Sequence, residues 1–217
     1  MENSKNILII TISSLAVILF VPLFILRGIG VFDFWWWFTA DIMILITIIA
    51  VLDRSFLSSI FDDFTKNIIP KIIIGLASVV LLYFVFYVGN LLSRMLMPFA
   101  GTEITDIYLF KGGISPLRIV LLMIFIIGPG EELLWRGSIQ RLFMKKYGSI
   151  TGFIITVALY TIVHAGSGNR MLLVSALVCS GFWGLIYLWR GSVLMTIISH
   201  TVWDIAVFIV FPFHKIL

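Results

Sequence analysis

Residues 7–26 read ILIITISSLAVILFVPLFIL, a run of 20 residues that contains no charged side chain. A helix of about 20 apolar residues spans the hydrocarbon core of a bilayer. No small-x-small cleavage pattern ends this run, and it is long for the apolar region of a signal peptide, which holds about 7–15 residues. We therefore predict a retained membrane-anchoring helix, with Lys5 just before it.

The composition extends this prediction to the whole chain of 217 residues, of which 61% are hydrophobic and 12% are charged. Soluble domains carry about 25% charged residues, so the sequence excludes an ordinary soluble enzyme, a disordered chain and a nucleic-acid binder. We attribute the formal charge of +4 to lysines and arginines in loops rather than to an anionic partner. The single cysteine, Cys179, cannot form an internal disulfide, and we expect it to pack in the core.

The sequence predicts an all-α fold, a polytopic transmembrane helical bundle of about seven spans, with about eight as the most that the length allows. Tryptophans at 35–37 open the second span, as is typical of a membrane interface. The charged segment 53–71 has apolar residues at helical spacing, which favours a helix along the surface. Pro129-Gly130 breaks the fourth span. The predicted spans are about 7–26, 34–52, 72–97, 119–146, 150–165, 171–189 and 192–213.

The charge distribution indicates an orientation. If the N-terminus lies in the cytoplasm, alternate loops hold nine lysines and arginines inside, Arg136 among them, and six outside. Cytoplasmic loops carry the excess of positive charge, so we predict a multi-pass protein of the cell (plasma) membrane with a cytoplasmic N-terminus. We interpret residues 1–217 as a single membrane domain, with variable N-terminal spans over 1–118 and a core over 119–213 that carries the motifs described next.

Ionisable residues inside the spans are candidate functional residues, because an unpaired charge costs several kcal/mol in a bilayer. Glu132 and Arg136 are four residues apart with the glutamate first, the better orientation for a helical ion pair. Glu131 lies about 100° around the same helix and has no such partner, so it is free for chemistry. Alternatively, both acids stabilise a helix N-terminus after Pro129-Gly130.

Two histidines repeat the spacing of four residues. Tyr160 and His164 share a face of the fifth span, and His200 and Asp204 share a face of the seventh. Taken alone, His164 could be a hydrogen-bonded packing residue, and His200 a histidine held by a carboxylate.

The distances along the chain bring these residues to related depths. If the fourth and fifth spans turn at Gly148, Glu131 and His164 lie 17 and 16 residues from the turn, both about 25 Å deep. His200 and Asp204 lie 9 and 13 residues after a turn at position 191, at depths of about 13–20 Å. We expect these side chains to converge in one polar pocket.

Such a pocket could hydrolyse a peptide bond. A carboxylate beside an imidazole can activate a water molecule as a general base, and a second histidine can donate a hydrogen bond to the oxyanion. Glu131, His164 and His200 could equally hold Zn²⁺ with one open position, and the residues alone leave both mechanisms open. The sequence has no His-Glu-x-x-His and no Gly-x-Gly-Asp signature, and AGSG at 165–168 is a weak serine-type motif.

Three motifs in order resemble those of the CPBP family, the CAAX-protease and bacteriocin-processing (Abi) family of intramembrane glutamic endopeptidases, which is related to the type II CAAX prenyl endopeptidases. The motifs are Glu131-Glu132-x-x-x-Arg136, Tyr160-x-x-x-His164 and His200-x-x-x-Asp204. The stretch 184–199 is also similar, so the likeness covers about residues 119–210.

The resemblance divides the motif residues into catalytic and supporting ones. It implies Glu131 as the water-activating base with His164 assisting, and His200 and Asp204 on the oxyanion side. The implied supporting residues are Glu132, Arg136 and Tyr160. Two positions depart from the usual pattern, since Tyr160 stands for Phe and Asp204 for Asn. An ionised aspartate cannot donate to an oxyanion, so Asp204 could instead orient His200 or be protonated. The resemblance also implies that no metal or other cofactor is needed, with zinc as the alternative.

We therefore expect an intramembrane endopeptidase that acts near the cytoplasmic half of the bilayer on a peptide or membrane-protein substrate. Lipid is an expected partner, nucleic acid is not, and the oligomeric state is not predicted. The substrate could be a prenylated C-terminus, a peptide pheromone or a bacteriocin leader. The alternatives are a non-catalytic immunity or scaffold protein and a proton-coupled transporter, although the sequence has no internal repeat of the kind transporters show. Asp41 in the second span stays unassigned, and His214 has no predicted role.

Overall fold

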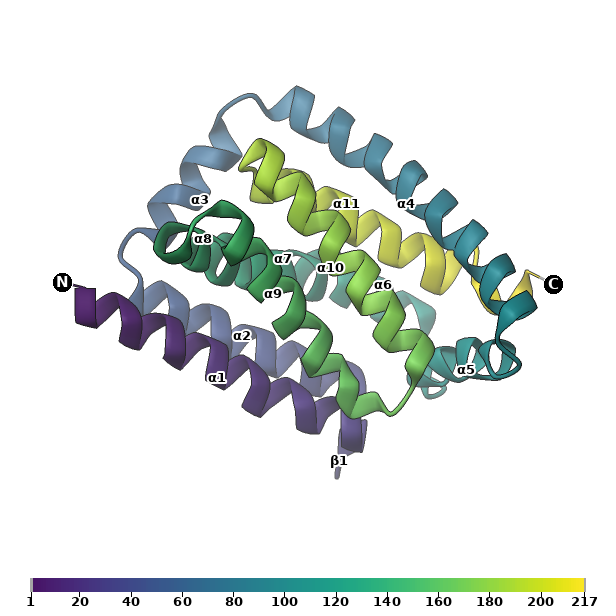
Figure 1. Cartoon of the computed structure of the whole chain (residues 1–217). Helices are drawn as coiled ribbons and strands as arrows, with labels where there is room; N and C mark the ends of the chain where they lie inside the picture. The colour runs from purple at the N-terminus through teal and green to yellow at the C-terminus, as the bar shows by residue number, and fades with distance from the viewer. Residues whose placement is uncertain (1, 217) are drawn as a thin grey trace.

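The computed structural model describes residues 2–216, and the side chains of residues 6–216. Within this range the chain forms a bundle of helices and one very short strand pair (Figure 1). The helices and strands are α1 (Glu2–Leu26), β1 (Gly28–Ile29), β2 (Phe32–Asp33), α2 (Phe34–Leu52), α3 (Phe56–Thr65), α4 (Ile68–Leu96), α5 (Ala100–Ile107), α6 (Pro116–Leu122), α7 (Gly128–Leu134), α8 (Arg141–Tyr147), α9 (Ser149–His164), α10 (Arg170–Arg190) and α11 (Val193–Ile205).

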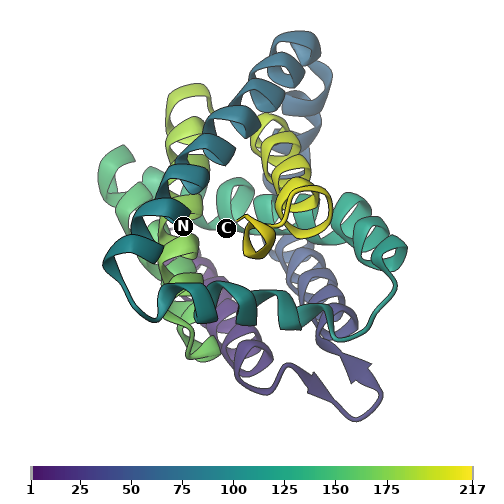
Figure 2. The ribbon, with the colours of Figure 1, turned by 90° about the vertical axis from the view of Figure 1, so that its right-hand side faces the viewer.

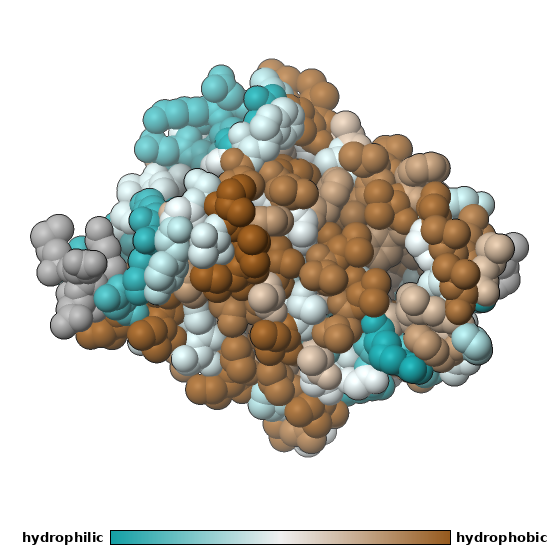
Figure 3. Space-filling view, viewed as in Figure 1, coloured by the Kyte–Doolittle hydropathy of each residue, from teal (hydrophilic) through white to brown (hydrophobic). Residues whose placement is uncertain are grey.

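Six helices are long and apolar enough to cross a membrane, and the prediction of an all-α multi-span bundle is confirmed. A seventh candidate span is the pair Ala100–Lys111 and Pro116–Tyr147, whose two parts are bent by 87°. The face shown in Figure 3 is largely apolar, and its hydrophilic residues gather toward the end where α3 lies. Such a surface is suited to lipid rather than to water. The six spans are Asn6–Leu26, Phe34–Leu52, Ile68–Leu96, Ser149–Ser167, Arg170–Arg190 and Val193–Lys215.

The fourth predicted span is not broken at Pro129-Gly130. The backbone stays helical from Pro116 to Tyr147, with π-helical turns at Met123–Ile127 and Trp135–Gln140. In the first π-turn, the Gly128 N–H bonds to the carbonyl of Met123, five residues back. Proline has no N–H and its ring crowds the preceding turn, so the wider turn just before Pro129 accommodates it without a gap. The sharp bend lies instead between Lys111 and Pro116, where α5 turns crosswise to the long helices (Figure 2).

Close helix packing positions the part of the chain around residue 131. A side chain at Gly130 would collide with Ile42, so glycine lets α7 approach α2 closely. On the other side, α4 packs against α11, where the Ser78 hydroxyl donates to the Ser199 hydroxyl at 2.7 Å. A Cβ at Gly75 would lie only 3.0 Å from the Ile198 side chain. The α1–α2 hairpin closes a third side through ring contacts such as Phe20–Phe38, 5.4 Å between centroids.

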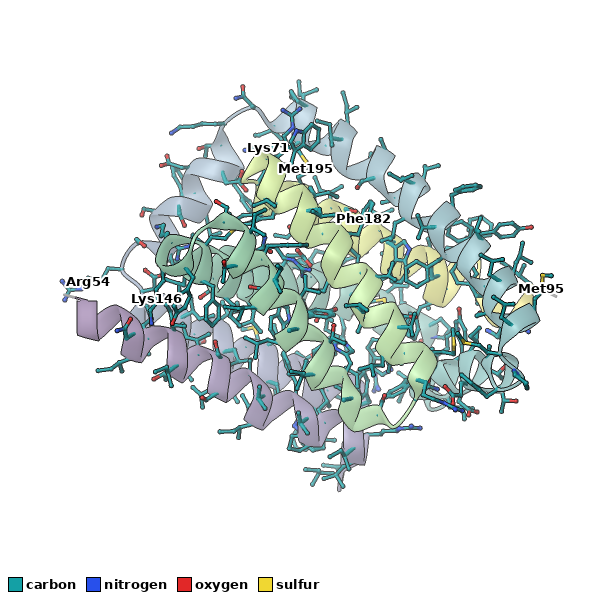
Figure 4. All side chains as sticks on the ribbon, viewed as in Figure 1. Arg54, Lys71, Met95, Lys146, Phe182 and Met195 are labelled. Carbon is teal, nitrogen blue, oxygen red and sulfur yellow. The ribbon has the colours of Figure 1, made fainter. Side chains whose placement is uncertain are left out.

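The predicted surface helix between the second and third spans is present as α3, at the same end of the bundle as the N-terminus (Figure 1). Arg54 and Lys146 lie at this end, and Met95 lies at the opposite end (Figure 4). The third span starts at Ile68, four residues earlier than predicted, because Lys71 in its first turn is neutralised by Asp63 at 2.6 Å. The other carboxylate oxygen of Asp63 accepts from the backbone N–H of Leu194 at 2.8 Å, so α3 also anchors α11.

A buried ion pair joins the end of α2 to α8. The Arg141 guanidinium pairs with Asp53 and donates to the Ser55 hydroxyl at 3.0 Å. Burial alone would raise the pKa of Asp53, but the hydrogen bonds from Ser55 and the charge of Arg141 hold that pKa below its ordinary value. A carboxyl group whose pKa is lowered by folding stabilises the fold at pH values above its unfolded pKa of about 3.9. This stabilisation is lost as the pH falls through the pKa of the folded state.

We expect Asp53→Asn to lower the free energy of unfolding by about 3–5 kcal/mol at neutral pH, because Arg141 is left buried without its partner. Thermal unfolding in detergent at several pH values measures this. The difference from wild type should shrink as the pH falls below about 4, because Asp53 is then protonated first in the unfolded chain and, at lower pH, in the folded protein. Asp62→Asn is the matched control, because Asp62 pairs with Lys66 on the surface and should change stability by less than about 1 kcal/mol. Equal effects of both variants at pH 7 would contradict this account.

Candidate active site

The centre of the site is the predicted ion pair between Glu132 and Arg136. Arg136 Nη1 lies 2.9 Å from Glu132 Oε1, and both side chains are 0% exposed. Arg136 Nη2 also donates to the backbone carbonyl of Ser180 at 3.0 Å. Two opposite charges buried in a low-dielectric interior are stable only when they are paired and hydrogen-bonded. This pair therefore connects the helix after Pro129 to α10.

His200 attaches α11 to the same pair. Its Nδ1 lies 2.7 Å from Glu132 Oε1, while its Nε2 lies 3.3 Å from Asp204 Oδ2 and 3.7 Å from Glu131 Oε2. The ring stacks on Trp183 with 3.7 Å between centroids. Each nitrogen of His200 thus faces a carboxylate, and the ring can move little between them.

Two of these contacts were not predicted from the sequence. Glu132 was expected to support the site through Arg136 alone, but it also holds His200, 68 residues further along the chain. Trp183 had no predicted role, although it stacks on His200 and donates through Nε1 to the Ser199 hydroxyl at 3.1 Å. The sequence does contain a signal that one face of α10 contributes to the site. Ser180 and Trp183 are three residues apart, so they share a face of this apolar span.

His164 is held by its own helix. Its Nδ1 lies 2.7 Å from the carbonyl oxygen of Tyr160, which can only accept, so Nδ1 carries the proton. In the neutral ring Nε2 is then the acceptor. The ring lies against Phe24 at 4.4 Å and the Tyr160 ring at 4.6 Å between centroids. The spacing of four residues thus gives His164 a defined tautomer and orientation.

A cavity of about 430 Å³ brings the predicted catalytic side chains together. Its lining includes all four of them: Glu131, His164, His200 and Asp204. Cys179, expected to pack in the core, is buried and borders the same cavity. The rest of the wall is mainly aromatic and aliphatic. The cavity therefore combines one polar end with an apolar interior, as ligand-binding cavities do.

Two other ionisable residues lie outside the cavity lining. Asp41 is buried in α2, next to the Ile42 that packs on Gly130, and its Oδ2 has no hydrogen-bond partner among the described residues. His214 packs its ring against Tyr108 at 4.1 Å between centroids. Neither residue belongs to the candidate active site.

The alternative zinc ligands do not form a metal cage. Among the described residues, no group of three or more His, Cys, Asp or Glu side chains is arranged to hold a metal ion. The nitrogens of His200 face Glu132 and Asp204 rather than a common point with His164. Glu131, His164 and His200 therefore do not fit a zinc site in this arrangement.

The position of the site bears on the predicted orientation. Arg136 lies inside the bundle rather than in a loop, so the inside count of nine lysines and arginines falls to eight, against six outside. His164 is the last residue of α9, at the end of the bundle opposite the N-terminus. A cytoplasmic N-terminus would thus place His164 toward the outer side of the membrane, while His200 lies near the middle of α11. The side of the membrane on which the N-terminus lies and the half of the bilayer in which the site acts both stay predictions.

The neighbouring glutamates should differ in their effect on stability. We expect Glu132→Gln to lower the free energy of unfolding by about 3–5 kcal/mol, because Arg136 is left as an unpaired buried charge. Glu131→Gln is the isosteric control and should cost much less, since the only ion-pair contact of Glu131 among the described residues is 3.7 Å long. Thermal unfolding of both purified variants measures the difference. If Glu131→Gln is destabilised as strongly as Glu132→Gln, this division of roles is wrong.

Comparison with known proteins is consistent with this geometry. Residues 113–206 match the family model described as type II CAAX prenyl endopeptidase Rce1-like. Comparisons with curated proteins and with solved structures return no significant match. The matched segment contains all three motifs and every residue of the ion-pair network. The resemblance to the CPBP, or CAAX-protease, family that the motifs indicate is therefore confirmed over residues 113–206.

Proposed function

We propose that this protein is an intramembrane endopeptidase in which Glu131, assisted by His164, activates the water that hydrolyses a peptide bond. The family match supports a CAAX-protease type of activity. The observation that carries the finer proposal is the shared cavity, which Glu131 and the acceptor nitrogen of His164 both border. A water molecule between them would meet two proton acceptors in a cavity whose wall is otherwise mainly apolar.

The reaction follows from these positions. Glu131 takes one proton from the water as its oxygen attacks the carbonyl carbon, and His164 Nε2 orients the water by accepting its second hydrogen. The tetrahedral oxyanion that forms accepts a hydrogen bond from Nε2–H of His200, whose ring carries a proton on both nitrogens because a carboxylate faces each of them. Glu131 then delivers its proton to the leaving nitrogen, and the C–N bond breaks. The products are a carboxylic acid and an amine, and Glu131 returns to its starting state.

The remaining network residues act on His200. Glu132 holds its Nδ1, so that Nε2 is directed into the cavity beside Asp204 at 3.3 Å. In this role Asp204 orients the imidazole and does not donate to the oxyanion, which accounts for aspartate at the position where the family usually has asparagine. Arg136 keeps Glu132 from shifting because it is itself bound to α10.

The apolar cavity favours a substrate with an apolar group next to the scissile bond. Aromatic and aliphatic side chains from α1, α2, α4 and α10 line it, and burial of apolar surface contributes about 25 cal/mol per Å². A prenylated C-terminal peptide is the substrate class that the family match supports. A membrane-embedded peptide, such as a pheromone or leader sequence, would present similar chemistry. We keep the cell membrane as the proposed location.

We expect Glu131→Gln and His164→Ala to reduce peptide cleavage at least about 100-fold, the range for loss of a general base. The assay uses purified protein and a farnesylated peptide ending in a Cys-a-a-X sequence, next to an unprenylated apolar peptide. His214→Ala is the matched control and should cleave like wild type, because His214 does not line the cavity. Full activity of Glu131→Gln would refute the mechanism. If the wild-type protein cleaves neither peptide, the immunity, scaffold or transporter alternatives are favoured instead.

Cleavage should also survive strong chelators, because the described acids and histidines form no metal cage. The measurement is the cleavage rate after dialysis against EDTA and 1,10-phenanthroline, together with the metal content of the purified protein. One zinc ion per chain, whose removal abolishes cleavage and whose return restores it, would overturn the proposed mechanism.

A further inference from the structure

The cavity wall contains two buried N–H donors that have no acceptor among the described residues. They are Nδ2 of Asn90 on α4 and Nε1 of Trp203 on α11. Both side chains border the cavity that Glu131 and His164 also line, and they are only 5% and 7% exposed. A buried donor without an acceptor is costly. The two donors therefore indicate that the acceptor comes from an occupant of the cavity.

The orientation of the Asn90 amide follows from its neighbour. Its Oδ1 accepts from Nε of Arg94 at 2.9 Å, so the NH₂ group is the part of the amide left for another partner. The hydroxyls of Ser93 and Ser175 also belong to cavity-lining residues, but each already donates to a backbone carbonyl of its own helix. Asn90 and Trp203 thus differ from these two serines of the same wall.

The two donors form a row that starts beside the candidate active site. Trp203 immediately precedes Asp204, and its ring packs on Phe86 of α4 at 4.8 Å between centroids. Asn90 lies four residues after Phe86, which is about 6 Å further along α4. The row therefore leads from Asp204 toward the end of the bundle where α5 lies (Figure 2).

An extended peptide offers main-chain carbonyl oxygens that such donors can bind. In a strand, the carbonyls of residues i and i+2 point to the same side and are separated by two rises, about 6.6 Å. The space beside the row is open enough for such a segment, since the face in Figure 3 is hollowed beside α10 toward α4, and both helices contribute to the cavity lining.

We propose that Asn90 and Trp203 bind two main-chain carbonyl oxygens of an extended substrate segment, on the side of the scissile bond that points toward α5. This inference rests on the proposed function, because it takes the occupant of the cavity to be a peptide. It assigns the two residues to substrate binding and not to the chemical step.

The test separates binding from catalysis. The probe is the farnesylated Cys-a-a-X peptide, with its affinity measured on protein carrying Glu131→Gln and its cleavage measured on otherwise wild-type protein. Asn90→Leu and Trp203→Phe remove one N–H each and keep an apolar side chain. We expect each to raise the Kd and the KM about tenfold, the effect of one hydrogen bond, with kcat changed by less than about threefold. Ser93→Ala is the matched control and should leave Kd and KM unchanged.

Peptides in which one amide is replaced by an ester identify the acceptor, because an ester carbonyl accepts hydrogen bonds more weakly. We expect an ester at one position to weaken binding to the Glu131→Gln protein but not to the Glu131→Gln protein that also carries Asn90→Leu. An ester two residues away should weaken binding to the Glu131→Gln protein but not to the Glu131→Gln protein that also carries Trp203→Phe. Such loss of additivity is the signature of a direct contact.

The outcomes distinguish the two proposals. The inference is overturned if the Kd is unchanged in both Asn90→Leu and Trp203→Phe. It is also overturned if the ester effects persist in these variants, whatever the enzyme cleaves. If the wild type binds the peptide through both donors but cleaves nothing, the inference stands and the proposed endopeptidase function fails. Circular dichroism and thermal unfolding of each variant verify that a loss of binding is not a loss of the fold.

Discussion

The ion pair between Glu132 and Arg136 is the interaction on which the rest of the site depends. Both charges are fully buried, and in a low-dielectric interior each would be strongly destabilising without the other. Arg136 also donates to the Ser180 carbonyl on α10, and the same oxygen of Glu132 lies against the His200 ring on α11. One local pair in the sequence therefore holds three separate helices at one depth in the bundle.

The same constraint separates the roles of two adjacent carboxylates. Glu132 points into the packed network, whereas Glu131, one helical step around, borders the cavity with His164. A carboxylate that is paired with a buried arginine contributes to stability, while a carboxylate held near a cavity can exchange protons with a substrate. The π-helical turns on either side of this segment are of the kind often found at functional sites.

Much of the fold was predictable because the bilayer limits the possibilities. Runs of about 20 apolar residues must be helices that satisfy their own backbone hydrogen bonds, and α1, α2, α9, α10 and α11 lie close to their predicted ranges. The disturbance at Pro129 was placed correctly but interpreted as a break, because a sequence pattern does not show that an adjacent π-turn can absorb a proline. The sequence predicts a loop where the crosswise helix α5 lies, since the eight residues of α5 are too few for a clear periodic pattern.

The sequence by itself determined which residues share a face of one helix. The spacing of four residues pairs Glu132 with Arg136, His164 with Tyr160 and His200 with Asp204, because 3.6 residues make one turn. Only the tertiary structure decided how those faces meet: that Glu132 binds His200, that Trp183 stacks on that ring, and that Asn90 on α4 faces the same cavity. The physical reason is that periodicity acts within a helix, whereas the rotation and depth of one helix against another follow from close packing such as that at Gly75 and Gly130.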